Sequence, residues 1–197
     1  MVRVLWTMRW SPRVWLVAGG AVVAGAVAWW LLARDEPPMD EALLDSVRPA
    51  IHEQLPRATE VSGGGMLTDA RQDPPARWFC AEKPIEIRRQ GTDIRVGMVA
   101  HCAEYGVRDG ALVNGTGTSG AMVVTVTGEP DAYRLSTVEW ARDGAAHAAS
   151  IREMFTPAGA REALRIEQGG EAPGSATLED EARRHFGLPP DAPVLPR

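Results

Sequence analysis

The residues best suited to chemistry in this chain are four His, two Cys and a Gly-rich segment that carries a Ser. The His residues share no spacing typical of metal ligands, and the sequence predicts neither a metal site nor another cofactor. One hypothesis places His52 and Glu53, on a first helix, next to His101 and Glu104, on a strand. Such a polar pocket would support an envelope enzyme, which we keep as an alternative. The His residues stand at positions 52, 101, 147 and 185.

The segment Gly117-Thr118-Ser119-Gly120-Ala121 is similar to a nucleophile elbow, in which a reactive Ser lies between a strand and a helix. Residues 122–127 are rich in β-branched side chains and predict a strand where the elbow needs a helix. No Gly-Lys-Ser/Thr follows, so a phosphate loop is also excluded. We interpret residues 117–120 as a hairpin loop and predict no catalytic residue.

Cys80 and Cys102 are predicted to form a disulfide across a β-hairpin. The strands 78–89 and 92–105 flank a turn at Gln90-Gly91, which would pair Ile87 with Ile94. The two Cys lie one residue out of that register, and a bulge at Pro84 would absorb the difference. A bridge closing a loop of about twenty residues contributes about 3 kcal/mol to stability.

Two other interpretations of the Cys pair are weaker. In the first, a metal ion is held by Cys80, His101 and Cys102, with Glu104 or Glu82 as the fourth ligand. His101 and Cys102 are adjacent on a strand, however, and adjacent strand residues point to opposite faces of a sheet. Free buried thiols are unexpected in an exported domain.

Large aromatic side chains in the predicted strands are candidates for ligand contact. Trp78, Tyr133 and Trp140 are the residues expected to contact a ligand bound at the concave face of the sheet or at its edge. The alternative is that these three side chains are part of the hydrophobic core.

The periodicity predicts an α+β fold in which a helix packs on a curved, four- to five-stranded antiparallel sheet, cystatin-like or cone-like. The helix covers Asp40 to Leu55, with Pro49 inside it and Pro56 at its end. A loop follows over residues 57–77, with a short strand around Glu60 to Leu67. The other predicted elements are the hairpin above, a turn at Asn114-Gly115, strands 121–127 and 133–140 joined at Glu129-Pro130-Asp131, helices 145–155 and 157–166, a linker 168–176, a helix 178–186 capped by Thr177 and ended by Gly187, and an extended Pro-rich tail.

Residues 14–33 form an uncharged apolar run that predicts a transmembrane anchor. Arg3, Arg9 and Arg13 precede it and acidic residues follow, so residues 1–13 are expected in the cytoplasm and the rest outside the plasma membrane. Residues 34–167 would form the extracytoplasmic domain, and residues 168–197 a linker, short helix and tail. Alternatives are a signal peptide cleaved after Ala26-Val27-Ala28 and a buried helix.

The chain has 197 residues and a net charge of −5, which disfavours nucleic acid as a partner.

The segment Tyr133 to Phe155 carries an aromatic strand, then Asp143-Gly144, then Ser150-Ile151 and a Phe. It resembles the end of uncharacterised secreted or membrane-anchored proteins of Gram-positive, actinobacterial-type bacteria. The resemblance implies an exported cell-envelope domain and brings no known activity.

The sequence therefore favours a non-catalytic binding or scaffold domain that takes an envelope protein or a small-molecule ligand. Besides the enzyme, a second alternative is an accessory subunit whose anchor and Pro-rich tail dock to a larger membrane complex.

Overall fold

A computed structural model describes residues 37–67, 73–169 and 172–195 of the chain. The predicted anchor at residues 14–33 lies outside this part. Among the helices that are described, none is long and apolar enough to cross a membrane.

The first described helix, α2 (Glu41–Gln54), begins and ends where its sequence predicts. Asp40 caps its start, since the Leu43 N–H donates to the Asp40 carboxylate at 3.0 Å. A 3₁₀ turn, η1 (Leu55–Arg57), contains Pro56 and ends the helix. The buried side of α2 consists of apolar residues spaced three and four apart, namely Leu43, Leu44, Val47 and Ile51.

Five strands form one open sheet, and four of them follow each other as a meander. β1 (Arg77–Gln90), β2 (Asp93–Arg108), β3 (Ala111–Thr127) and β4 (Arg134–Trp140) pair antiparallel in this order. The fifth strand, β5 (Val194–Leu195), pairs parallel with β3. The α+β class is thus confirmed, but the sheet is mixed and not wholly antiparallel.

The mixed topology arises because β4 is much shorter than β3. β4 pairs with residues 122–127 of β3 and leaves residues 111–121 of that edge without a β4 partner. The C-terminal tail fills part of this gap, where Leu112 N–H donates to Pro193 O at 2.9 Å. Backbone groups left open at a sheet edge are thereby satisfied.

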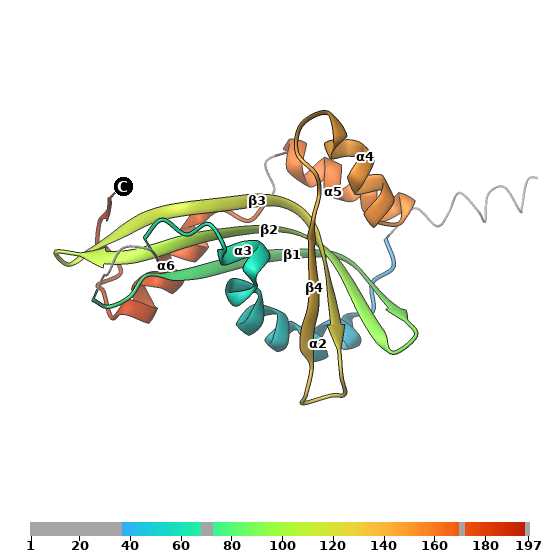
Figure 1. Ribbon diagram of the computed structural model, residues 1–197, viewed down its shortest axis with the longest axis horizontal. Coiled ribbons are helices and arrows are strands. Elements are labelled where there is room, and N and C mark those ends of the chain that lie inside the picture. Colours follow the sequence, from blue (N-terminus) through green and yellow to red (C-terminus); the bar gives the residue numbers. More distant parts are fainter. Residues whose placement is uncertain (1–36, 68–72, 170–171, 196–197) are drawn as a thin grey trace, which may run out of the picture. The chain divides into compact units, whose positions relative to one another are not determined.

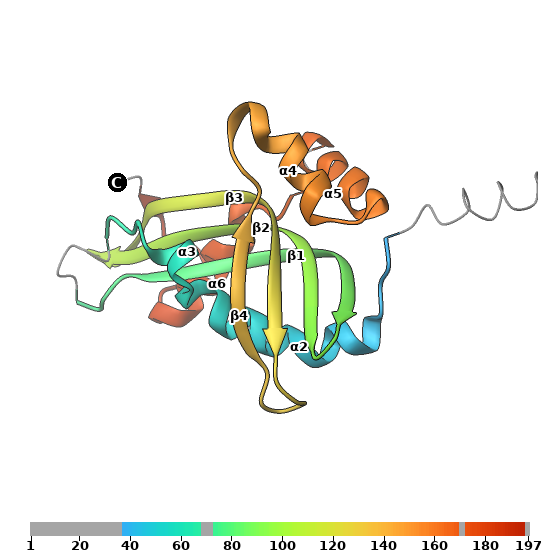
Figure 2. The same cartoon turned by 45° about the vertical axis from the view of Figure 1, so that its right-hand side comes forward.

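The three long strands bend along their length, so the sheet is curved (Figures 1 and 2). The pairing is interrupted between Pro84 and Glu86 in β1 and between Ala103 and Tyr105 in β2. Irregularities of this kind bend a strand and increase its twist. The bulge predicted at Pro84 is confirmed within one residue.

Both faces of the sheet are covered by helices. Met98, Ala100 and Cys102 of β2 are buried with α2, whereas Val99 and Ala103 point to the opposite face. That second face is covered by α4 (His147–Met154), α5 (Pro157–Gly169) and α6 (Ser175–Phe186). A short 3₁₀ turn, η2 (Gly144–Ala146), leads into α4.

The β1–β2 register differs from the prediction by two residues. Gln90 pairs with Asp93, so the turn consists of Gly91 and Thr92, and Ile87 lies opposite Val96 and not Ile94. A bulge in β1 then shifts the pairing by one residue and brings Cys80 opposite Cys102. With the predicted turn at Gln90-Gly91, the pairing would have to shift by one residue in the opposite direction to bring the two Cys together.

The β2–β3 turn is also in a different place. Asp109 and Gly110 have φ angles of 53° and 76° and form the turn, whereas Asn114-Gly115 lies inside β3. Residues 117–120 are likewise part of β3 and not a hairpin loop. Ser119 therefore has strand on both sides, which excludes the nucleophile elbow.

Smaller differences concern the ends of the domain. The strand predicted around Glu60 to Leu67 is wrong, because Thr59–Ser62 forms a short helix, α3. The last helix begins at Ser175 and not after Thr177, while Gly187 ends it in a left-handed conformation as predicted. Leu178 and Ala182 pack into the sheet, so α6 belongs to the same compact unit as the strands.

Candidate functional site

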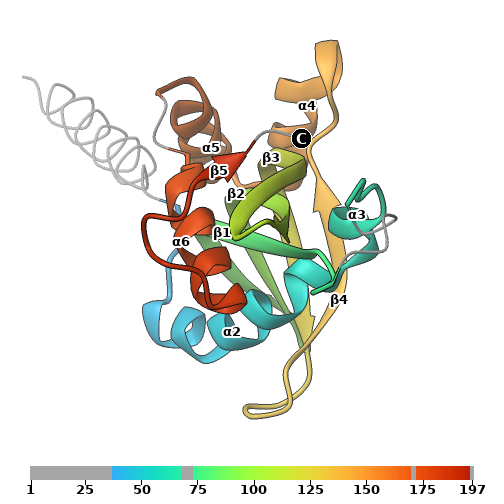
Figure 3. The same ribbon diagram turned by 90° about the vertical axis from the view of Figure 1, so that its left-hand side faces the viewer.

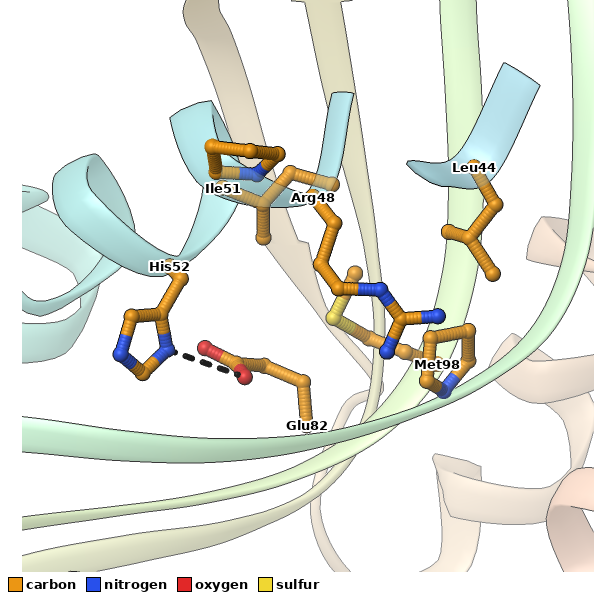
Figure 4. A pocket seen from close by; sticks show the side chains of 8 residues that line it. Leu44, Arg48, Ile51, His52, Glu82 and Met98 are labelled. Atoms are coloured by element: carbon orange, nitrogen blue, oxygen red, sulfur yellow. Dashed lines mark ion pairs between the residues drawn. The ribbon is translucent and has the colours of Figure 1, made fainter. Parts of the chain in front are cut away.

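A pocket of about 350 Å³ lies between α2 and the strands β1 and β2 (Figure 4). We call it the α2 pocket. Its walls are mainly apolar, and three charged or titratable side chains, Arg48, His52 and Glu82, reach into it. The apolar lining consists of Leu44, Pro49, Ile51, Pro84 and Met98.

The helical repeat explains why α2 supplies so many of these side chains. Leu44, Arg48 and His52 are spaced four residues apart and therefore follow one another along the same side of the helix. The Asp40 cap and the buried Val47 hold α2 on the sheet in this rotation. Two of the three polar groups and part of the apolar wall thus come from the same helix, and the strands supply the rest.

The disulfide fixes the strand side of the pocket. Cys80 and Cys102 are bonded, with their Cα atoms 4.1 Å apart, as predicted. Glu82 is two residues beyond Cys80 on β1 and points to the same face of the sheet. The bond also excludes the alternative in which the two sulfurs ligate a metal.

Glu82 is the most buried charged group of the pocket. Its side chain is 15% exposed, and Figure 4 shows the carboxylate projecting toward α2 between His52 and Arg48. Burial raises the pKa of Glu82 above its ordinary value of 4.5, and the nearby His52 opposes this shift. Within the described part of the chain, its Oε1 atom has no hydrogen-bond partner although it is shielded from solvent.

His52 lies between two carboxylates from different elements. Its Nδ1 is 3.6 Å from Glu82 Oε2, and its Nε2 is 3.5 Å from Glu181 Oε1. Glu181 belongs to α6, on the other face of the sheet, so helices from both faces meet at the β1 edge (Figure 3). His52 thus links the α2 pocket to a neighbouring groove lined by α2, β1 and α6, in which Trp78 is one of the β1 residues.

Arg48 forms the outer wall of the α2 pocket. Its side chain is 53% exposed and lies 3.7 Å from Asp45, one turn earlier on α2. An exposed pair at this distance is screened by water and contributes little to stability. Asp45 nevertheless balances the charge of Arg48 at the pocket mouth.

The arrangement is suited to binding rather than to covalent catalysis. No Ser, Thr or Cys is among the residues that line the α2 pocket. His52 and Glu82 could exchange a proton, but no activated nucleophile adjoins them. Apolar walls with a few converging polar groups are the usual makeup of a small-molecule site.

The structure does not bring His52 and His101 together. His101 lies between Ala100 and Cys102 on β2, both of which face α2, so its own side chain points to the opposite face. Burial on that face lowers the pKa of His101. Glu104 is also elsewhere, accepting hydrogen bonds from the N–H groups of Met66 and Leu67. The polar cluster predicted from these residues is therefore wrong.

The three aromatic candidates belong to the hydrophobic core. Trp78 and Tyr133 are buried against α2, and Trp140 packs partly exposed at the margin of the same cluster. None of them lines the α2 pocket. In the described part of the chain, no three His, Cys, Asp or Glu side chains are placed to hold a metal ion.

Sequence reasoning singled out His52 but missed the groups that surround it. The sequence offers Glu82 only as an alternative metal ligand and assigns no role to Arg48. A usable signal existed, since Leu44, Arg48 and His52 recur at four-residue intervals beside the buried side of the predicted helix. The contribution of β1 depends on the strand register and carries no such local signal.

Comparison with protein-family models, with curated proteins and with solved structures finds no match to this chain.

Proposed function

We propose that this chain is a non-catalytic binding protein whose domain takes a small, mainly apolar molecule in the α2 pocket. We further propose that residues 14–33 anchor it in the plasma membrane, with the domain on the outer side, at the cell envelope. The anchor follows from the uncharged run and its flanking charges, and the disulfide Cys80–Cys102 is consistent with an oxidising compartment.

The observation that carries the binding proposal is the composition of the α2 pocket. Its volume of about 350 Å³ falls in the lower range for ligand pockets, which suits a small molecule. Burial of apolar ligand surface against Leu44, Ile51 and Met98 would provide most of the binding free energy. A helix laid across a curved sheet is also the layout of cystatin-like and cone-shaped ligand-binding domains, which supports the proposal by analogy of fold alone.

Methionine methyl NMR provides a direct test, because Met98 lines the α2 pocket and Met154 lies in the core on the opposite face. We expect titration with 2-phenylethanol, a small apolar alcohol, to shift the Met98 methyl signal saturably and to leave that of Met154 unchanged. Met98→Phe, which fills the pocket, should abolish binding. Equal shifts at both methyl groups, or no shift at Met98, would contradict a ligand site beneath α2.

The location can be tested separately by intact mass. The full-length protein from membranes, alkylated with and without prior reduction, should retain residues 1–33 and should take up label on both Cys only after reduction. A mass beginning at Trp29 would indicate a cleaved signal peptide. Labelling without reduction would argue against an oxidising location.

A further inference from the structure

The charges around the α2 pocket sum to a negative value. His52 faces two carboxylates, Glu82 at 3.6 Å and Glu181 at 3.5 Å, so this group stays net negative with both acids ionised even when His52 is protonated. The only other charged side chain of the lining, Arg48, lies 3.7 Å from Asp45, which offsets its charge. The pocket therefore favours a cation over an anion.

Glu82 also has unused hydrogen-bonding capacity. Oε2 faces His52, whereas Oε1 is shielded from solvent and has no partner in the described part of the chain. A buried carboxylate oxygen without a donor is unfavourable, and a ligand N–H would satisfy it if the Glu82 carboxylate turned toward the pocket. A charged donor would form the stronger bond with this oxygen.

We infer that the α2 pocket binds an organic ammonium ion with an apolar body, and that Glu82 is its counter-ion. This inference rests on the proposed binding function and names the ligand class. The ammonium group lies against the Glu82 carboxylate, and the apolar body packs on Leu44, Ile51 and Met98.

An anionic ligand is the competing class, because Arg48 also lines the pocket. The guanidinium of Arg48 belongs to a side chain that is 53% exposed, so water screens its field. Glu82 is only 15% exposed and acts in a lower dielectric. The buried charge thus decides the ligand sign.

Three ligands with the same phenyl body separate these classes: 2-phenylethylammonium, 2-phenylethanol and 3-phenylpropanoate. Titration calorimetry on the full-length protein should show the ammonium ion binding about tenfold more tightly than the alcohol, the gain expected from one charge-assisted bond. The anion should bind more weakly than the alcohol. Glu82→Gln keeps the shape of the side chain and should abolish the preference for the ammonium ion, while the exposed Glu129→Gln serves as the matched control.

Each outcome separates the two proposals. Alcohol binding at Met98 without any preference for the ammonium ion, or a preference that survives Glu82→Gln, would overturn the ammonium inference and leave the pocket as a binding site. Tighter binding of 3-phenylpropanoate would assign the pocket to anions through Arg48 and would also overturn it. If the Glu82→Gln protein no longer binds 2-phenylethanol and its Met122 methyl signal is displaced, the variant is misfolded. Arg48→Gln is then the second variant. The inference predicts that the Arg48→Gln protein still prefers the ammonium ion, and loss of that preference would overturn it.

Discussion

His147 Nε2 lies 2.8 Å from Glu167 Oε2, and this contact joins the start of α4 to the end of α5. The other ring nitrogen, Nδ1, lies 3.0 Å from the carbonyl oxygen of Arg142. Both neighbours accept hydrogen bonds, so only the doubly protonated imidazolium can donate to both at once. Glu167 in turn accepts a hydrogen bond from Ala121 N–H of β3 at 2.7 Å.

This arrangement predicts that the contribution of the His147–Glu167 pair to stability falls as the pH rises. The hydrogen bond to Glu167 raises the pKa of His147 above its ordinary value of 6.5. A raised folded-state pKa contributes stability that is complete below pH 6.5 and is lost as the pH rises through the folded-state pKa. Urea unfolding between pH 6 and pH 9 should show this decrease.

Glu167→Gln is the informative variant, because its amide oxygen can still accept from Ala121 N–H while the charge is lost. It should flatten the decrease in stability above pH 6.5, and His147→Gln should do the same. An unchanged pH profile in both variants would mean that this pair does not set the profile.

The Cys80–Cys102 bridge should contribute about 3 kcal/mol to the free energy of unfolding, as expected for a closed loop of about twenty residues. Both Cys are buried, so the double variant Cys80→Ala/Cys102→Ala removes the bond without placing a polar side chain in the core. Urea unfolding should show a loss of this size in the double variant. Reductant should lower the stability of the native protein and leave the variant unaffected; a reductant effect on the variant would point to another cause.

Gly159 of α5 packs against the carboxylate of Glu86, which is 2% exposed. A methyl group at Gly159 would overlap Glu86 Oε2, which accepts hydrogen bonds from the backbone N–H and the hydroxyl of Thr156. Replacing Gly by Ala inside a helix ordinarily stabilises it by about 1 kcal/mol. We expect Gly159→Ala instead to destabilise the domain by about 1–3 kcal/mol, the range for overpacking.

Gly169, at the end of the same helix, is the control for that substitution. A Cβ there would meet no atom within 4 Å. Thermal unfolding should show a clearly lowered Tm for Gly159→Ala and almost no change in Tm for Gly169→Ala. Similar behaviour of the two variants would show that the contact between Gly159 and Glu86 is not tight in solution.

Gln54, at the end of α2, ties this helix to β4. Its amide nitrogen donates to Tyr133 O at 3.1 Å, and its amide oxygen accepts from Leu135 N–H at 3.0 Å. Gln54→Glu can still accept but cannot donate when ionised. We expect both Gln54→Glu and Gln54→Ala to cost about 1–2 kcal/mol in urea unfolding, and faster amide exchange at Leu135 only in the Ala variant. Protection of Leu135 that survives Gln54→Ala would contradict this contact.

Much of the secondary structure was predictable because its signals are local. Asp40 before an apolar period predicts the start of α2, and Gly187 predicts the end of α6. The alternation around two Cys was enough to predict the disulfide, since a hairpin brings symmetrically spaced residues together. The α+β class follows from the succession of these elements.

Which turn is used was decided by long-range pairing. Asp109-Gly110 and Asn114-Gly115 are both strong turn dipeptides, and local sequence does not rank them. The chain turns at Asp109-Gly110 because β3 then lies along the full length of β2, pairing Ala111 with Arg108 and Val126 with Ile94. A later turn would leave part of β2 without a partner strand.

The residues of the α2 pocket depend on the tertiary structure more than the secondary structure does. A side chain on a strand changes face with each residue, so His101 and Cys102 end on opposite sides of the sheet. The sequence by itself determined most of the helices, the strands on either side of the Cys pair and the covalent bridge. Only the fold decided that His52 meets Glu82 and Glu181 and not His101, because register, bulges and helix placement are set by the packing of the whole core.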